Sequence, residues 1–170
     1  RLDAEQIRDS MLTVSGEGDF TMGGPGVTGK TPRRSIYLRF MRNTRDPFLD
    51  AFDLPDGFNS AAHRDVTTTA TQALLLINDD WTVKRASALA ARIEAEGHGS
   101  RESKIERAYW LAFGRAPSPG ELKDASDYLE RNHDRLVREA GNREPEKADA
   151  RALGDLCHAL MNSNEFLYAD

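Results

Sequence analysis

Residues 24–31 of this chain read Gly-Pro-Gly-Val-Thr-Gly-Lys-Thr and satisfy the phosphate-binding loop pattern G-x-x-x-x-G-K-[ST] at every position. In such a loop, main-chain N–H groups surround the phosphates of a nucleoside triphosphate. The lysine reaches the outer phosphates, and the hydroxyl group holds a magnesium ion. Lys30 and Thr31 are therefore the candidate nucleotide-binding residues.

The flanks of this segment do not support nucleotide binding. A phosphate-binding loop follows a buried strand and opens a helix at its lysine, whereas residues 16–23 are rich in glycine and hold two acids. Pro32 disfavours helical geometry at Thr31. The apolar run 74–79 ends in an acid that could support the metal, but its flanks fit helices better than a strand. We therefore expect a flexible glycine-rich surface loop, with nucleotide binding as the less favoured alternative.

A second candidate site lies directly after the loop, where residues 33–45 contain five arginines. The alternation over residues 34–41 predicts a short strand with Ile36, Leu38 and Phe40 facing the core. Arginines beside an aromatic ring suit planar anions such as carboxylate, phosphate or sulfate. The candidate ligand-binding residues are Arg34, Tyr37, Arg39, Arg42 and Arg64.

Three interpretations of these arginines are open. They can line an anion pocket between the strand and residues 55–67, and the acids Asp53, Asp56 and Asp65, a little downstream of the strand, could converge there. They can instead pair with the acids of the C-terminal half and fix the two halves together, as charged clusters commonly do. In the third interpretation, His63 and Asp65 are the acid and base of a hydrolase that upstream domains complete.

The histidines and the single cysteine give no metal or nucleophile motif. No pair among His63, His98, His133 and His158 has the spacing of metal ligands with another His, Cys or acid. Cys157 shares a helical stripe with leucines, which predicts a buried apolar thiol. We expect no metal and no cofactor on this chain.

The composition is that of an ordinary globular domain. The chain has 170 residues, 39% of them hydrophobic and 30% charged, which is enough for one domain with a real core. A net charge of −5 disfavours nucleic-acid partners. No segment resembles a signal peptide or a transmembrane helix, so we expect no membrane insertion. Because the chain begins at Arg1, we expect a domain of a longer protein.

Helix signals dominate the chain and predict a mainly α fold of about five to six helices, with a short β element near residues 34–41. Residues 1–66 are the looser part, and residues 67–170 are helical. Asp3 caps a first helix, and Asp46 with Pro47 starts a short one. Further helices begin near residues 69, 79, 118 and 145, and another helix carries Ile105, Ala108, Tyr109 and Ala112. Ala70, Ala73, Leu74 and Ile77 form the expected core face of the helix that begins near residue 69.

Four blocks and the C-terminal segment carry a family resemblance. The blocks are residues 1–10 with 21–25, 33–38 with 52–56, 67–68 with 72–78, and 105–109 with 114–117, followed by 156–168. In order and spacing they resemble the planctomycete-specific C-terminal domain of unknown function of large exported proteins. One position departs from it, because Ala70 stands where that family often has proline. Residues 27–31 fall where the family is variable, which counts further against a nucleotide loop.

The resemblance implies an exported, cell-envelope setting and upstream domains of the same polypeptide, often including a cytochrome-c-like domain. It implies no reaction, and the haem motif of that domain is absent from this sequence. We therefore expect a non-catalytic packing or interaction module that binds an anionic small molecule or glycan through its arginines.

Overall fold

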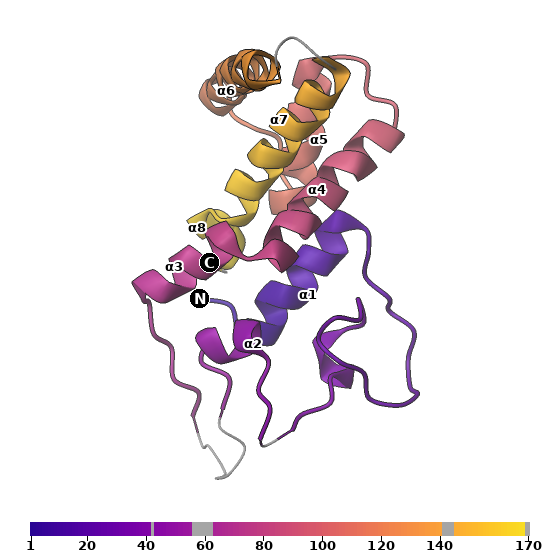
Figure 1. Ribbon diagram of the computed structural model, residues 1–170, viewed down its shortest axis with the longest axis vertical. Helices are drawn as coiled ribbons and strands as arrows, with labels where there is room; N and C mark the ends of the chain where they lie inside the picture. The colour runs from indigo at the N-terminus through magenta and orange to yellow at the C-terminus, as the bar shows by residue number, and fades with distance from the viewer. Residues whose placement is uncertain (42, 56–62, 141–144, 169–170) are drawn as a thin grey trace.

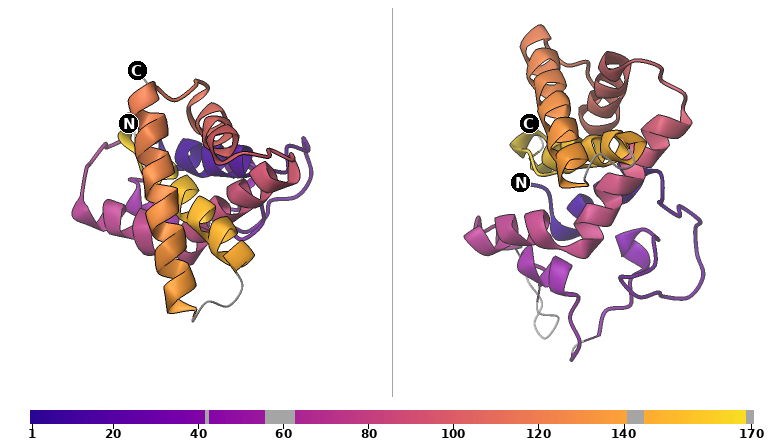
Figure 2. Two further views of the ribbon diagram at one scale, coloured as in Figure 1. Left: turned by 90° about the horizontal axis from the view of Figure 1, so that it is seen from above. Right: turned by 45° about the horizontal axis from the view of Figure 1, so that its top comes forward.

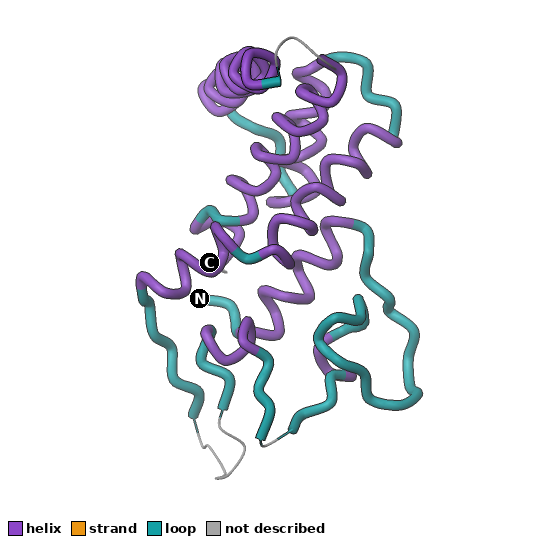
Figure 3. Tube along the Cα trace, viewed as in Figure 1, coloured by secondary structure: helices purple, strands orange, loops and turns teal. Residues whose placement is uncertain are grey.

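The computed structural model describes residues 1–41, 43–55, 63–140 and 145–168, and these residues form a mainly helical fold. Figure 3 shows helices and loops only in this part of the chain. The prediction of a mainly α domain is confirmed, with eight α-helices in the described residues rather than five or six. The helices are α1 (Ala4–Ser15), α2 (Pro47–Ala51), α3 (Ala70–Asn78), α4 (Asp80–Ala95), α5 (Arg101–Phe113), α6 (Pro119–Glu139), α7 (Pro145–Met161) and α8 (Asn164–Leu167).

The core lies where α4 packs against both α1 and α7, with α6 packed on the other side of α7 (Figure 1). Leu89 and Ile93 of α4, Ile7 and Met11 of α1, and Cys157 of α7 are fully buried. These helices direct their apolar stripes at this core. The apolar periodicity of the sequence therefore predicted most of the helices. Cys157 is buried as predicted, and burial raises the pKa of its thiol to about 12.

The predicted helix starts are confirmed in detail. Asp46 caps α2, accepting hydrogen bonds from the N–H groups of Phe48 and Leu49, and Asp79 caps α4. Ser118 forms a capping box with Glu121 at the start of α6. These side chains satisfy main-chain donors that a helix start leaves without partners.

The predicted strand at residues 34–41 is wrong. Residues Ser35–Tyr37 form a short 3-10 helix, and only isolated bridges such as Val27 to Leu38 pair this segment. The cause is a long-range contact, because the Asp9 carboxylate of α1 accepts hydrogen bonds from the Ser35 N–H at 2.8 and 3.1 Å and turns the chain there. As a consequence Ile36 is 75% exposed rather than facing the core.

The predicted core face of α3 is also wrong. Leu74 and Ile77 are more than half exposed, whereas Gln72 and Leu76 are buried. Gln72 lies inside because its side-chain amide bonds to the Ala51 carbonyl at 3.0 Å and to the first residue of the chain. A core tolerates a buried polar side chain that has hydrogen-bond partners. The face of α3 that carries Gln72 and Leu76 therefore packs on the core, in place of the predicted face.

The chain ends and the segment after α2 are joined to the helices by polar contacts. The Arg1 guanidinium donates to Asp53 at 2.7 Å, and Asp53 also accepts from the N–H and hydroxyl of Thr67, both at 2.8 Å. The Leu2 N–H donates to the Leu167 carbonyl at 2.9 Å, so the start of the chain lies beside α8 (Figures 1 and 2). No helix in the described part of the chain is long and apolar enough to cross a membrane.

Arg115 joins α5, α6 and α8 and predicts an acid-dependent loss of stability. Its guanidinium bonds to Glu121 at 2.7 and 2.9 Å and to Glu165 at 2.6 and 2.7 Å. These bonds lower the pKa of Glu121 from 4.5 to about 2. A carboxyl whose pKa is depressed by folding stabilises the fold above its unfolded value and loses that effect as pH falls towards the folded value.

We therefore expect the wild-type protein to lose more unfolding free energy between pH 6 and pH 3 than the Arg115→Gln variant loses. Urea titrations at the two pH values measure this difference. The two Glu side chains are largely solvated, which keeps the difference small. An identical loss in both proteins would show that the network does not stabilise the fold.

Candidate functional site

The loop that matches the phosphate-binding pattern is built around a buried arginine. Arg8, on the inner side of α1, is 2% exposed. Its guanidinium donates to the carbonyls of Gly29 at 3.1 Å, Thr31 at 2.8 Å and Arg33 at 2.8 Å. Burial lowers the pKa of Arg8 below its usual range, but three carbonyl dipoles and a nearby Ser35 hydroxyl stabilise the charged form.

This arrangement is the opposite of a phosphate cradle. A phosphate-binding loop directs main-chain N–H groups at an anion, whereas here the carbonyls of Gly29 and Thr31 are directed at a cation. The Thr31 N–H is used within the loop, donating to the Thr28 carbonyl at 3.0 Å. No helix begins at Lys30, because the next element is the 3-10 helix at residues 35–37. The geometry therefore favours the expected surface loop over a nucleotide site.

Gly29 is a glycine for a packing reason. A Cβ atom added at this position would lie 2.0 Å from Oδ2 of Asp46. Asp46 cannot retreat freely, because its other oxygen caps α2 through Phe48 and Leu49. One glycine of the motif thus serves the close approach of the loop to α2 rather than a ligand.

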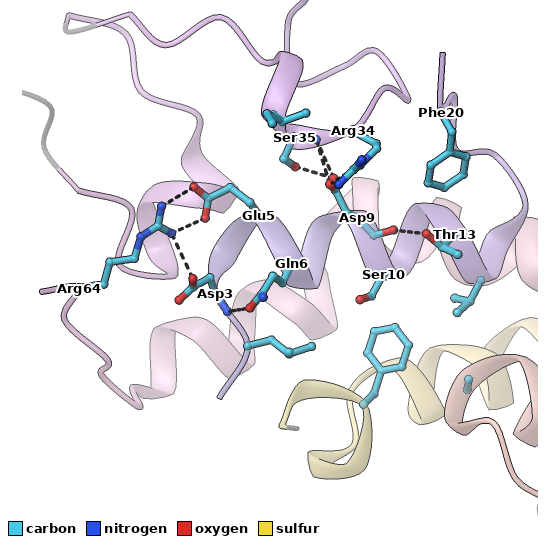
Figure 4. A pocket seen from close by; sticks show the side chains of 15 residues that line it. Asp3, Glu5, Gln6, Asp9, Ser10, Thr13, Phe20, Arg34, Ser35 and Arg64 are labelled. Atoms are coloured by element: carbon cyan, nitrogen blue, oxygen red, sulfur yellow. Dashed lines mark hydrogen bonds and ion pairs between the residues drawn. The ribbon is translucent and has the colours of Figure 1, made fainter. Parts of the chain in front are cut away.

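The structure divides the candidate arginines between two hollows. Arg34 and Arg64 line a groove of about 910 Å³ along α1, drawn in Figure 4. Arg64 is bonded to Glu5 at 2.7 and 3.0 Å and lies 3.5 Å from Asp3. Arg34 lies 3.9 Å from Asp9. Both guanidinium groups in this groove are therefore balanced by carboxylates of α1, and the Arg64 hydrogen bonds lower the pKa of Glu5.

Tyr37 does not offer an open ring for a ligand to stack on. The Arg33 guanidinium lies 4.2 Å from the centroid of the Tyr37 ring, a cation–π distance. The Tyr37 hydroxyl accepts a hydrogen bond from the Gly23 N–H at 3.0 Å. Arg33 also donates to the Thr21 carbonyl at 2.8 Å. Arg33 and Tyr37 thus hold the loop together internally.

The second hollow, which we call the Lys30–Arg39 cavity, has a volume of about 590 Å³. Its walls are formed by residues 28–30 and 44–48 together with Arg8, Arg39, Met41, Leu75, Asp79 and Trp81. Arg39 is exposed, and the only bond of its side chain within the described residues is to the Gly26 carbonyl at 3.2 Å. Lys30 is exposed and forms no hydrogen bond or ion pair within the described residues. Both cations therefore retain their charge for a ligand.

The remaining walls of this cavity are apolar or already satisfied. Phe48 and Trp81 pack with ring centroids 5.3 Å apart, and Met41 and Leu75 extend the apolar surface. The carboxylates of Asp46 and Asp79 are engaged as helix caps. The cavity therefore combines two free cations with an aromatic wall.

The expected pairing of the arginines with acids of the C-terminal half is not what the structure shows. Arg34 and Arg64 pair with acids of α1, and Arg45 pairs with Asp50 of α2 at 2.6 Å. Arg42 and Asp56 lie outside the described residues. The cluster fixes the N-terminal loops to α1 and α2, which precede the helical half.

The hydrolase candidates His63 and Asp65 are exposed. The Nδ1 atom of His63 lies 2.6 Å from the carbonyl oxygen of the next residue. Neither side chain lines the groove or the cavity, so the structure does not bring them together with the candidate arginines. Among the described residues, no group of three or more His, Cys, Asp or Glu side chains is arranged to hold a metal ion.

Sequence reasoning missed Arg8, Phe48 and Trp81 as site residues. A signal for Arg8 was present, because it follows Ala4 by four residues and precedes Met11 by three, inside the apolar stripe of α1. A charge in such a stripe needs buried partners. The aromatic pair gave no local signal, because α2 and α4 meet only in the fold.

The fold and its two hollows define a small helical domain with a basic, loop-built cavity beside its core. A family model described as "PSD1: Protein of unknown function (DUF1553)" matches residues 1–129. The chain therefore belongs to this family, whose members are domains of unknown function. No curated protein and no solved structure gives a significant match.

Proposed function

We propose that this domain is a non-catalytic binding module that takes a small amphipathic anion in the Lys30–Arg39 cavity. The observation that supports the proposal is the state of the two cations. Lys30 and Arg39 line one cavity, and within the described residues neither has a carboxylate partner. Of the six described residues that the sequence singled out as ligand contacts, these two alone line that cavity with a cation that has no carboxylate partner among the described residues.

The chemistry of the walls indicates the kind of ligand. A guanidinium and an ammonium group bind carboxylate, sulfonate or phosphate oxygens. Phe48 and Trp81 supply an apolar surface for the body of the molecule. A volume of about 590 Å³ is in the range of small-molecule pockets. An anionic group on an aromatic or aliphatic body fits this combination better than a free inorganic ion.

The first test uses 8-anilinonaphthalene-1-sulfonate, an aromatic sulfonate whose fluorescence rises on binding. We expect saturable binding by the wild-type domain. Lys30→Ala and Arg39→Ala should each weaken it about tenfold, because each removes one charge-assisted contact. Fluorescence titration at low ionic strength measures the dissociation constants.

Two control variants are matched to these changes. Lys84→Ala removes an exposed lysine of α4 that has no bond within the described residues, as Lys30 has none. Arg138→Ala removes an arginine whose bond, like that of Arg39, goes to one main-chain carbonyl. Neither control lines the cavity, so both should bind the dye as the wild type does. Equal weakening by all four variants would mean that net charge, rather than the cavity, attracts the dye.

The wider setting is a further part of the proposal. We propose that the module works inside a larger exported polypeptide and contacts its neighbouring domains, as the family resemblance implies. The planctomycete origin, the cytochrome-c-like neighbour and the location at the cell envelope stay predictions. The full coding sequence tests them, since it would reveal any export signal or haem-attachment motif outside residues 1–170.

A further inference from the structure

Several large apolar side chains are exposed on the loop between α1 and α2. We call residues 18–41 the basic lobe, because they contain four basic residues and one acidic residue, whereas residues 65–170 contain fourteen basic and nineteen acidic ones. Five large apolar side chains of the lobe are at least half exposed. They are Phe20 at 52%, Met22 at 88%, Ile36 at 75%, Phe40 at 51% and Met41 at 52%.

The lobe presents these side chains on a fixed scaffold. Arg33 is buried beneath it and donates to the carbonyls of Thr21 and Gly23. The Val27 N–H donates to the Tyr37 carbonyl at 2.9 Å, and the Val27 carbonyl accepts from the Arg39 N–H at 2.7 Å. The two arms of the lobe are thus tied to each other by main-chain bonds. These bonds hold the loop in the conformation in which Met22 and Ile36 are exposed.

The lobe lies away from α6 but packs on α1, whose Asp9 accepts hydrogen bonds from Ser35 of the lobe. In Figure 1 the coil between α1 and α2 occupies the lower right of the molecule, and α6 lies at the opposite end. The right-hand view of Figure 2 shows the same separation. Arg34, Lys30 and Arg39 are the exposed cations among the apolar residues of the lobe. Asp19 is its one acid and lies 3.8 Å from Arg33.

We propose that the basic lobe docks the domain on a membrane surface that contains anionic lipids. Exposed cations approach the lipid phosphates, while methionine, isoleucine and phenylalanine side chains enter the boundary between headgroups and acyl chains. The side chains enter only this boundary, so docking needs no spanning helix. Lys30, Arg39 and Met41 of the lobe also line the Lys30–Arg39 cavity, so the inference is tested at Met22, Ile36 and Arg34, which do not line it.

A lipid surface fits these residues better than an acidic protein does. Protein interfaces require one continuous, shape-complementary patch of about 800 Å² on each partner. The exposed apolar side chains of the lobe instead border different hollows, since Phe20 and Ile36 line the α1 groove with Arg34, whereas Met41 lines the Lys30–Arg39 cavity. A bilayer accepts such a pattern without complementary shape, because its headgroups rearrange around each side chain.

The test is cosedimentation with vesicles of phosphatidylcholine alone or with 30% phosphatidylglycerol. We expect the domain to bind the anionic vesicles at least tenfold more tightly than the neutral ones at about 0.1 M salt, since each cation near an anionic surface strengthens binding roughly fivefold. The double variant Met22→Ser with Ile36→Ser should bind the anionic vesicles about tenfold more weakly. Arg34→Gln should weaken binding by less than about fivefold, because Asp9 lies 3.9 Å from the Arg34 guanidinium, and it should reduce the salt dependence.

The matched control is Leu74→Ser with Ile77→Ser on α3. These side chains are 58% and 54% exposed but lie outside the basic lobe. The control should bind vesicles as the wild type does, and thermal melts verify that both double variants remain folded. Equal binding to neutral and anionic vesicles would overturn the proposal. An equal loss in the α3 variant, or binding to neither vesicle, would also overturn it and favour a protein partner.

Discussion

Arg8→Met is expected to destabilise the domain by about 4 kcal/mol. The change removes a buried guanidinium that donates to the carbonyls of Gly29, Thr31 and Arg33. Each buried carbonyl left without a donor costs about 1–3 kcal/mol. Urea denaturation followed by circular dichroism measures the loss of unfolding free energy. Hydrogen exchange at residues 24–33 should also speed up, because the loop loses the group around which it is built.

The control for this change is Arg107→Met. Arg107 pairs with Glu96 on the surface between α4 and α5 at 2.5 and 2.9 Å. A surface pair contributes less than about 1 kcal/mol, so the control should remain close to the wild type. If Arg8→Met costs no more than Arg107→Met, the loop is not organised by Arg8. The loop residues 28–30 that form one wall of the Lys30–Arg39 cavity would then not be held in place by Arg8.

Leu76→Ala is expected to cost about 3 kcal/mol, and Leu74→Ala less than about 0.5 kcal/mol. Leu76 is 2% exposed and Leu74 is 58% exposed, although they are two residues apart on the same helix. A buried leucine cut to alanine loses its transfer free energy and leaves a cavity, whereas an exposed one loses little. Thermal or urea unfolding of the two variants measures the difference. Equal losses, or a larger loss for Leu74→Ala, would show that α3 packs on the core through Leu74, as the sequence predicted.

The α3 helix shows where periodicity alone is insufficient. Its sequence allows two stripes, and the one with only apolar residues is the natural choice for the core. The fold buries the other stripe because Gln72 finds partners on Ala51, Thr67 and Arg1, which lie far away in the chain. Such partners are invisible to a local pattern. Helix starts were predictable because a cap lies within three residues of the groups that it satisfies.

The same reasoning applies to the candidate site. The sequence drew attention to residues 24–45, and both hollows do border this segment. The sequence could not show which arginines form ion pairs within the domain and which do not. The carboxylates that pair with Arg34 and Arg64 come from α1, far away in the chain. Taken alone, the phosphate-binding pattern indicates a loop whose N–H groups face an anion. In the structure the carbonyls of Gly29 and Thr31 face the Arg8 guanidinium instead.

The central claim is that the Lys30–Arg39 cavity is the ligand site, and its most direct test is to locate a bound anion. Two-dimensional ¹H–¹⁵N spectra recorded during titration with 8-anilinonaphthalene-1-sulfonate report which residues it touches. The account predicts shifts at the amides of Gly29, Lys30 and Arg39 and at the Trp81 indole. Shifts confined to residues of the α1 groove, such as Gln6 and Ser10, would contradict it.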